Sequence, residues 1–250
     1  MNKRIVLITI ILTLIIIFIP QFTFAQPELG DLGLIFNNED PQATVGTVRL
    51  LILLTVLTLA PSFLILTTCF TRIPVVLSFL RNALGTQQSP PNQLLLGLAL
   101  FLTFFVMQPV YSQIMEEAVT PFLEESITQE EAIDIAVVPM KEFMLKQTRE
   151  KDLALFLRAS NSENVQEPMD LSITTIIPAF AISELKKAFS IGFIIYIPFL
   201  VIDMVVASIL MSMGMFMLPP VMISLPFKIL LFVLVDGWYL VVESLLKSFT

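Results

Sequence analysis

Two residues of opposite charge interrupt the last two long apolar stretches of the sequence. Asp203 lies within residues 189–211, and Lys228 lies within residues 221–242. A charge at the centre of a membrane helix costs about 2.5–3.5 kcal/mol, so such residues usually face protein or water and pair with one another. If the two stretches form an antiparallel hairpin, positions 203 and 228 lie level across its turn. We therefore predict an ion pair, within one subunit or between two; the alternative is that both residues snorkel near an interface.

The turn of this hairpin is rich in methionine. Four of the seven residues 211–217 are Met. Gly214 loosens the backbone there, and the prolines at 219–220 prevent a continuous helix. Methionine is unbranched and polarizable, so it adapts to the shape of a neighbour. A ring of these side chains could close a pore and reshape around a moving peptide, whereas the simpler interpretation is hydrophobic filling at a helix turn.

Further charges lie close to the ends of the apolar stretches. Glu184 and Lys187 are three residues apart, so they can pair on one helix face. The simpler interpretation of this pair is a solvated helix end. Asp236 lies near the end of the last apolar stretch. All three residues are candidates for contacts between subunits.

The residue types argue against several classes of function. The sequence has no histidine and one cysteine, Cys69, so it offers no His base, no His-containing metal site and no intrachain disulfide. The polar turn at residues 85–93 lacks the Gly-Lys-Ser/Thr of a phosphate-binding loop. A net charge of −7 argues against a nucleic-acid partner. We therefore expect no enzyme, no cofactor, no metal site and no nucleic-acid binding.

The composition indicates the setting of these residues. Of 250 residues, 56% are apolar and 14% are charged, whereas soluble domains have about 45–50% and about 25%. Mean hydropathy is +0.87. We predict a polytopic membrane protein with four helical segments, because backbone polar groups in lipid must be satisfied internally. The segments are residues 48–70, 94–111, 189–211 and 221–242.

The rest of the chain gives the expected domains and orientation. A positive start, an apolar run and small residues before position 26 predict a signal peptide at residues 1–25, with an uncleaved first helix as the alternative. An acidic lead-in, a first hairpin, an outer helical domain and a second hairpin follow, at residues 26–47, 48–111, 112–188 and 189–250. Residues 71–93 carry Arg72 and Arg81 but no acid, and residues 112–188 carry 14 acids and 7 bases. The positive-inside rule then places residues 71–93 inside and residues 112–188 outside.

Within residues 112–188 we expect two helices and a loop. Apolar residues recur every three or four positions along residues 130–150, where Pro139 should kink or split the helix. Residues 151–158 predict a second, short helix. Residues 160–170 read as a polar loop.

Two long stretches resemble the FliP family of flagellar biosynthesis proteins. Residues 62–111 read SFLILTTCFTRIPVVLSFLRNALGTQQSPPNQLLLGLALFLTFFVMQPVY, and residues 177–238 include IPAFAISELKKAFSIGFIIYIPFLVIDMVVASILMSMGMFMLPP. They cover about half of the chain, and the acidic region between them matches in character and length only. The resemblance implies an all-α membrane protein of two long helical hairpins and a small extracytoplasmic helical domain, which assembles into a helical hetero-oligomer.

The resemblance also implies a function. It suggests a core subunit of the type III export gate in the bacterial inner membrane at the flagellar basal body, where several copies, usually five, join FliQ and FliR to pass unfolded flagellar proteins. Most of the assembled mass would lie towards the periplasm. The family's charged positions match Glu184, Asp203 and Lys228. Its methionine gasket, which seals the pore, matches Met213, Met215, Phe216 and Met217, and Phe216 stands where some relatives have Met.

Two other functions stay open from the residues. One is an ion or solute transporter that uses Asp203 as a coupling site, which would need several convergent polar groups that the first two apolar stretches do not supply. The other is a structural scaffold in which the Met-rich turn only fills space. The first predicts transport by this chain alone, and the second predicts assembly defects without leakage.

Overall fold

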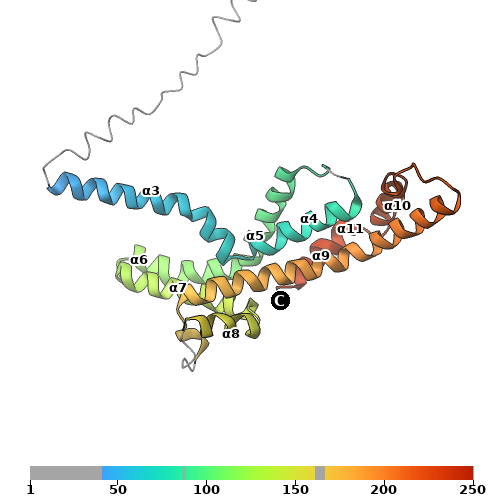
Figure 1. Ribbon diagram of the computed structural model, residues 1–250. Coiled ribbons are helices and arrows are strands. Elements are labelled where there is room, and N and C mark those ends of the chain that lie inside the picture. The colour runs from blue at the N-terminus through green and yellow to red at the C-terminus, as the bar shows by residue number, and fades with distance from the viewer. Residues whose placement is uncertain (1–40, 87, 161–166, 250) are drawn as a thin grey trace, which may run out of the picture. The chain divides into compact units, whose positions relative to one another are not determined.

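The computed structural model describes residues 41–86, 88–160 and 167–249, and every regular element within these ranges is a helix (Figure 1). The prediction of an all-α fold is therefore confirmed. The predicted signal peptide and most of the acidic lead-in lie outside the described residues. The elements are α3 (Pro41–Thr67), η1 (Cys69–Thr71), α4 (Arg72–Leu84), α5 (Asn92–Ile114), η2 (Met115–Val119), α6 (Thr120–Leu123), α7 (Gln129–Gln147), α8 (Glu150–Ala159), η3 (Pro168–Asp170), α9 (Ile173–Ser212), α10 (Pro220–Leu234) and α11 (Gly237–Lys247).

Helix α3 carries the first apolar stretch. It begins at Pro41, inside the predicted lead-in of residues 26–47. Proline suits the first turn of a helix, where its missing N–H is not needed. The chain divides into two compact units at residue 58, within this helix, and the remaining helices all belong to the second unit.

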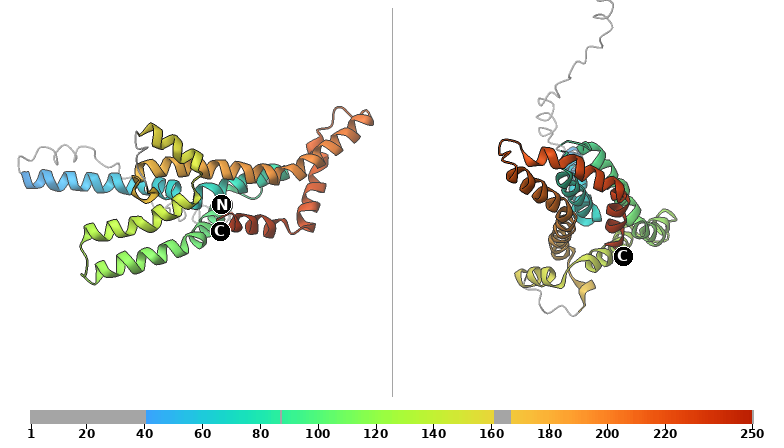
Figure 2. Two further views of the ribbon diagram at one scale, coloured as in Figure 1. Left: turned by 90° about the horizontal axis from the view of Figure 1, so that it is seen from below. Right: turned by 90° about the vertical axis from the view of Figure 1, so that its right-hand side faces the viewer.

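Helix α4 supplies the largest share of the main core of the second unit and packs along α9. Its buried side chains recur every three or four residues, which is the spacing of one helix face: Ile73, Val76, Leu77, Leu80, Ala83 and Leu84. On α9, Gly192 allows the close approach, because a Cβ there would lie 2.6 Å from Cγ of Phe79. Figure 2 shows α9 as the long helix along which α4 and α8 lie.

The predicted outer region consists of α6, α7 and α8 together with the start of α9. A single π-helical turn, η2, continues α5 into α6. Helix α7 begins with a capping box between Thr128 and Glu131 and runs through Pro139 to Gln147. Of the two predicted effects of this proline, a split is therefore wrong, and a kink stays a prediction. Helices α7 and α8 pack on α9 around a second small core of Met144, Leu171, Ile176 and Phe180.

Helix α9 is longer than the predicted third segment. It spans 40 residues, whereas the apolar stretch that predicts it covers only residues 189–211. The expected boundary between the outer domain and the second hairpin, at residues 188 and 189, therefore falls inside one uninterrupted helix.

The predicted fourth segment, residues 221–242, is not one helix, and this prediction is wrong. Helices α10 and α11 meet at an angle of 65°. The break lies at Asp236, whose backbone is left-handed with φ 52°. At Gly237 a Cβ would lie 2.1 Å from Cδ2 of Phe232, so the packing of this corner requires glycine.

Among the described residues, three helical stretches are long and apolar enough to cross a membrane. The bent pair α10–α11 would be a fourth if it counts as one span. The continuous stretches are Val48–Thr67, Asn92–Leu123 and Ile173–Ser212. Length and composition therefore support a membrane protein.

Candidate gate loop and its charged supports

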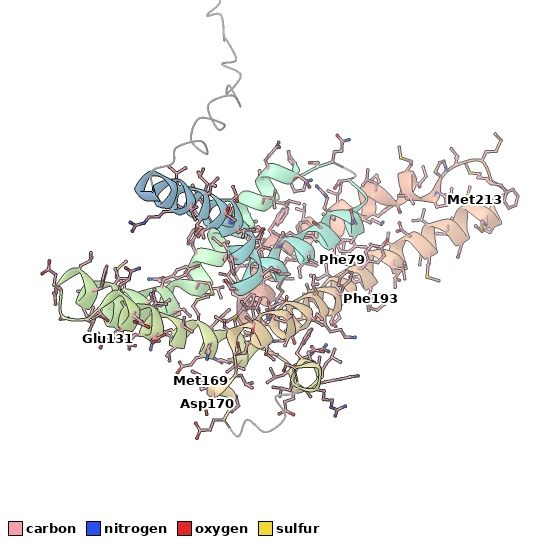
Figure 3. The ribbon with its side chains drawn as sticks, turned by 60° about the vertical axis from the view of Figure 1, so that its left-hand side comes forward. Phe79, Glu131, Met169, Asp170, Phe193 and Met213 are labelled. Atoms are coloured by element: carbon pink, nitrogen blue, oxygen red, sulfur yellow. The ribbon has the colours of Figure 1, made fainter. Side chains whose placement is uncertain are left out.

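The Met-rich turn lies between α9 and α10, at residues 213–219. Gly214 has φ +76°, a left-handed conformation that glycine adopts without strain, and a Cβ there would meet no atom within 4 Å. Phe216 is 79% exposed and Met217 is 97% exposed. Figure 3 places Met213, which is also exposed, at the end of α9. All four predicted gasket residues thus have exposed side chains in a single chain.

Asp203 and Lys228 lie on α9 and α10, the two helices that flank this turn, and they form an ion pair within one chain. Lys228 Nζ lies 2.6 Å from Asp203 Oδ2, and Ser224 Oγ donates a hydrogen bond to Asp203 Oδ1. The Lys228 side chain is 2% exposed and that of Asp203 is 22% exposed. A buried charge that loses its partner destabilises a protein by about 3–5 kcal/mol. This pair therefore constrains how α9 and α10 lie against each other next to the loop.

Lys228 has a second partner that the sequence did not indicate. Its Nζ donates a hydrogen bond of 3.1 Å to the carbonyl oxygen of Ala83, in the last turn of α4. Carbonyls at a helix C-terminus lack intrahelical partners and carry partial negative charge, so a cation there is favourable. One ammonium group thus joins α4, α9 and α10. Helix i,i+4 spacing could have suggested Ser224, but no sequence signal points to Ala83.

A second buried cluster centres on Arg72, at the start of α4. Arg72 binds both carboxylate oxygens of Glu184, and both side chains are wholly buried. Its Nη1 donates to the Ser248 carbonyl and hydroxyl oxygens at 2.7 Å, and its Nη2 donates to Gln147 Oε1 at 3.0 Å. The guanidinium also stacks on Phe249, 3.8 Å from the ring centroid. This arginine therefore ties together α4, α7, α9 and the segment that follows α11.

This cluster contains two of the predicted residues. Glu184 binds Arg72 rather than Lys187 and is wholly buried within one chain, and its contact with a neighbouring subunit stays a prediction. Lys187 donates to Gln147 Oε1 at 2.8 Å instead. The direct contact of Arg72 with Glu184 also means that residues 71–93 and 112–188 are not separated by a membrane in this conformation. Asp236, the third contact candidate, is exposed at the corner between α10 and α11.

Next to this cluster, Arg149 and Asp152 join α8 to α9. Asp152 accepts hydrogen bonds from Arg149 Nε at 2.8 Å and from Ser183 Oγ at 2.6 Å. Burial alone would raise the pKa of Asp152, but the hydrogen bonds from Ser183 and Arg149 outweigh burial and lower this pKa below its ordinary value. The carboxylate therefore remains ionised at neutral pH and fixes the start of α8. Ser183 and Asp152 are 31 positions apart in the chain, so no local sequence pattern indicates their contact.

The described residues offer little for catalysis. No group of three or more His, Cys, Asp or Glu side chains could hold a metal ion in residues 41–86, 88–160 and 167–249. The Cys69 side chain is wholly buried, and its thiol donates a hydrogen bond of 3.9 Å to the Thr103 carbonyl oxygen. A buried structural cysteine of this kind is inert.

Comparison with known proteins gives one consistent family. The model of the FliP family matches residues 53–245. This range includes the Met-rich loop and the helices that carry the two charged clusters. The flagellar biosynthetic protein FliP of Bacillus subtilis (strain 168) is 63% identical over 215 residues, which cover 86% of this chain and 97% of the relative. The FliP of Pectobacterium carotovorum subsp. carotovorum is 57% identical, over 83% of this chain and 81% of the relative. The FliP of Aquifex aeolicus (strain VF5) is 53% identical, over 82% of this chain and 87% of the relative.

Proposed function

Because the chain belongs to the FliP family, we propose that it is a core subunit of the gate through which unfolded flagellar proteins are exported. The family forms part of the flagellar export apparatus and has a structural, non-enzymatic role. The gate would contain several copies of this chain, about five, with homologues of FliQ and FliR. It would lie in the bacterial inner membrane, with most of its assembled mass towards the periplasm.

The observation that carries this proposal is the exposure of the Met-rich loop at the end of a rigid support. Side chains as apolar as Phe216 and Met217 are rarely left fully in water in clusters. The Asp203–Lys228 pair holds the two helices that present them. Loops from several copies would meet around an axis and form an apolar seal. Flexible methionines could then move aside for a passing peptide and close again.

The outer surfaces of α9 and α10 favour an assembly. Large apolar side chains are exposed along both helices, so lipid or neighbouring subunits must cover them. The Arg72–Glu184 contact argues against four simple membrane crossings, because it brings the start of α4 to α9. Both facts are consistent with helices that pack against copies and partners after they leave the lipid.

A leak assay tests the seal. The variant in which Met215, Phe216 and Met217 are all replaced by Ala should let small ions and solutes through the assembled gate in resting cells. In the matched control, Ala replaces Met204 and Met222, which are exposed on α9 and α10 outside the loop. The gate with this control variant should not leak. An assembled triple variant that leaks no more than this control would refute the gasket role.

The transporter alternative has no observation in its favour. A coupling carboxylate must be free to bind and release an ion, whereas Asp203 is bound by Lys228 and Ser224. The scaffold alternative is separated by the same leak assay, because it predicts that loop variants change assembly and not leakage.

A further inference from the structure

A basic pocket lies beside the buried cluster, and neither the family nor the gate role assigns it a ligand. It has a volume of about 230 Å³ and lies between the start of α4, the start of α8, α9 and the residues after α11. Four of the side chains that line it are basic, namely Arg72, Arg149, Lys186 and Lys187, and Ser190 and Ser248 add hydroxyl groups. Because the whole chain has a net charge of −7, this concentration of positive charge stands out.

Only part of this charge is compensated by protein. Glu184 neutralises Arg72, and Asp152 neutralises Arg149. Lys187 donates to Gln147, a neutral amide, and Lys186 is exposed and has no ion pair or hydrogen bond among the described side chains. Two positive charges therefore remain for an anion. The volume equals that of roughly eight water molecules at about 30 Å³ each, which is enough for a phosphate group.

The helix beside the pocket indicates which anion it is. Along α9, Lys186, Phe193, Ile197 and Met204 recur at intervals of seven or four, so they lie on one face of the helix. Phe193 is 63% exposed, and Ile197 and Met204 are exposed as well. Figure 3 shows Phe193 on α9 between the outer region and the loop at Met213. The face thus changes from basic to apolar at the pocket.

The dimensions fit one leaflet of a bilayer. Half of a hydrocarbon core of about 30 Å equals about ten helical residues at about 1.5 Å each, which is the distance from Lys187 to Ile197. We propose that this pocket binds the phosphate of an anionic phospholipid, whose acyl chains lie along the exposed apolar face of α9. Basic pockets next to apolar helices commonly hold such headgroups. The proposal requires contact with a membrane and does not depend on the gate role.

Lipid titration of the full chain in mild detergent tests this site. Native mass spectrometry would count bound phosphatidylglycerol and, separately, phosphatidylcholine with the same acyl chains. A lysine near an anionic lipid contributes about fivefold in affinity, so two lysines should give phosphatidylglycerol an advantage of about 30-fold. The variant Lys186→Gln/Lys187→Gln should lose this advantage, and Lys186→Arg/Lys187→Arg should keep it. The matched control, Lys146→Gln/Lys151→Gln, removes the same charge from elsewhere and should bind as the native chain does.

Two further arms separate the possible sources of the anion. Inorganic phosphate at millimolar concentration should not displace phosphatidylglycerol, because it lacks acyl chains. Displacement, together with equal affinity for both lipids, would show a phosphate-ion site and overturn the lipid proposal. If lipid binding is unchanged in the double Gln variant but its oligomers dissociate, the pocket holds an acidic segment of a second copy and the proposal is also wrong. The single variant Lys186→Gln serves if the double variant does not fold, since Lys186 is exposed.

Discussion

Lys228 of α10 donates a hydrogen bond to the carbonyl oxygen of Ala83, 145 residues earlier in the chain, at 3.1 Å. The same ammonium group lies 2.6 Å from Asp203. The C-terminal turn of α4 and the two helices that flank the Met-rich loop therefore share one buried cation. This arrangement gives the loop a fixed base although its own side chains are exposed.

Removal of either member of the pair should cost more than removal of both. Lys228→Met leaves Asp203 with Ser224 alone, and Asp203→Asn leaves a buried ammonium group; we expect each to lower the free energy of unfolding by about 3–5 kcal/mol. Because the carboxylate of Asp203 is 22% exposed, Lys228→Met, which leaves this carboxylate without its cation, should lie at the lower end of that range.

A double-mutant cycle measured by denaturation in detergent checks this prediction. Because the double variant is expected to cost less than either single variant, the coupling energy should exceed about 3 kcal/mol, the upper end of the usual range for residues in contact. The exposed pair Glu243–Lys247 provides the control and should show little coupling. Additive effects of the two variants at 203 and 228 would contradict the account.

Arg72→Lys should destabilise the chain although the charge is kept. A lysine cannot bind Glu184 with two parallel hydrogen bonds, reach Ser248 and Gln147 and stack on Phe249 together. We expect a loss of about 2–4 kcal/mol and faster hydrogen exchange at residues 245–249. Arg81 is partly exposed, so Arg81→Lys serves as the control. It should change the stability and the exchange at residues 245–249 much less. Unchanged exchange at the C-terminal residues of the Arg72 variant would argue that the cluster does not hold them.

Gly192→Ala should disturb the contact between α9 and α4. The new Cβ would lie 2.6 Å from the Phe79 side chain, and overpacking of this kind costs about 1–3 kcal/mol. Phe79→Leu should restore part of the lost stability in the double variant. Gly97→Ala is the control, because a Cβ there meets nothing within 4 Å, and alanine is the better helix former by about 1 kcal/mol. Equal unfolding midpoints for both alanine variants would contradict the packing argument.

The stability contributed by Asp152 should depend on pH. Its pKa is lower in the folded chain than the ordinary value of about 3.9, so the folded state binds fewer protons between these two values and stability falls as the pH drops through them. At pH 7, Asp152→Asn should be less stable than the native chain by about 1–3 kcal/mol. Thermal unfolding at pH 7 and at pH 3 should show this difference shrink with acid. Asp134→Asn, at an exposed site on α7, should show no such change.

The helices and one ion pair could be predicted from the sequence, and the failures have physical causes. Apolar runs locate α3, α5 and α9 because lipid-compatible helices need them. The start of α9 was not predicted because residues 173–188 mix apolar, polar and charged side chains. The packing of α9 on α4 and α8 nevertheless continues through these residues. The α10–α11 corner was hidden in an apolar run, although the dipeptide Asp236-Gly237 is a turn signal.

The two buried ion pairs of the candidate site also differ in whether the sequence could predict them. The level positions of Asp203 and Lys228 follow from the length of a hairpin, so spacing alone predicted that they would pair. The Arg72–Glu184 contact joins residues 112 positions apart, and charge counting had placed them on opposite sides of a membrane. Contacts of this range depend on how the helices pack, which local pattern does not specify.

The mass of the purified complex tests the central claim most directly. The chain would be expressed alone and together with its FliQ and FliR homologues, purified in mild detergent and measured by native mass spectrometry. The account predicts a discrete multimer of this chain, of about five copies, that captures both partners. A monomer or dimer that binds neither partner would contradict the proposal that this chain is a core subunit of the export gate.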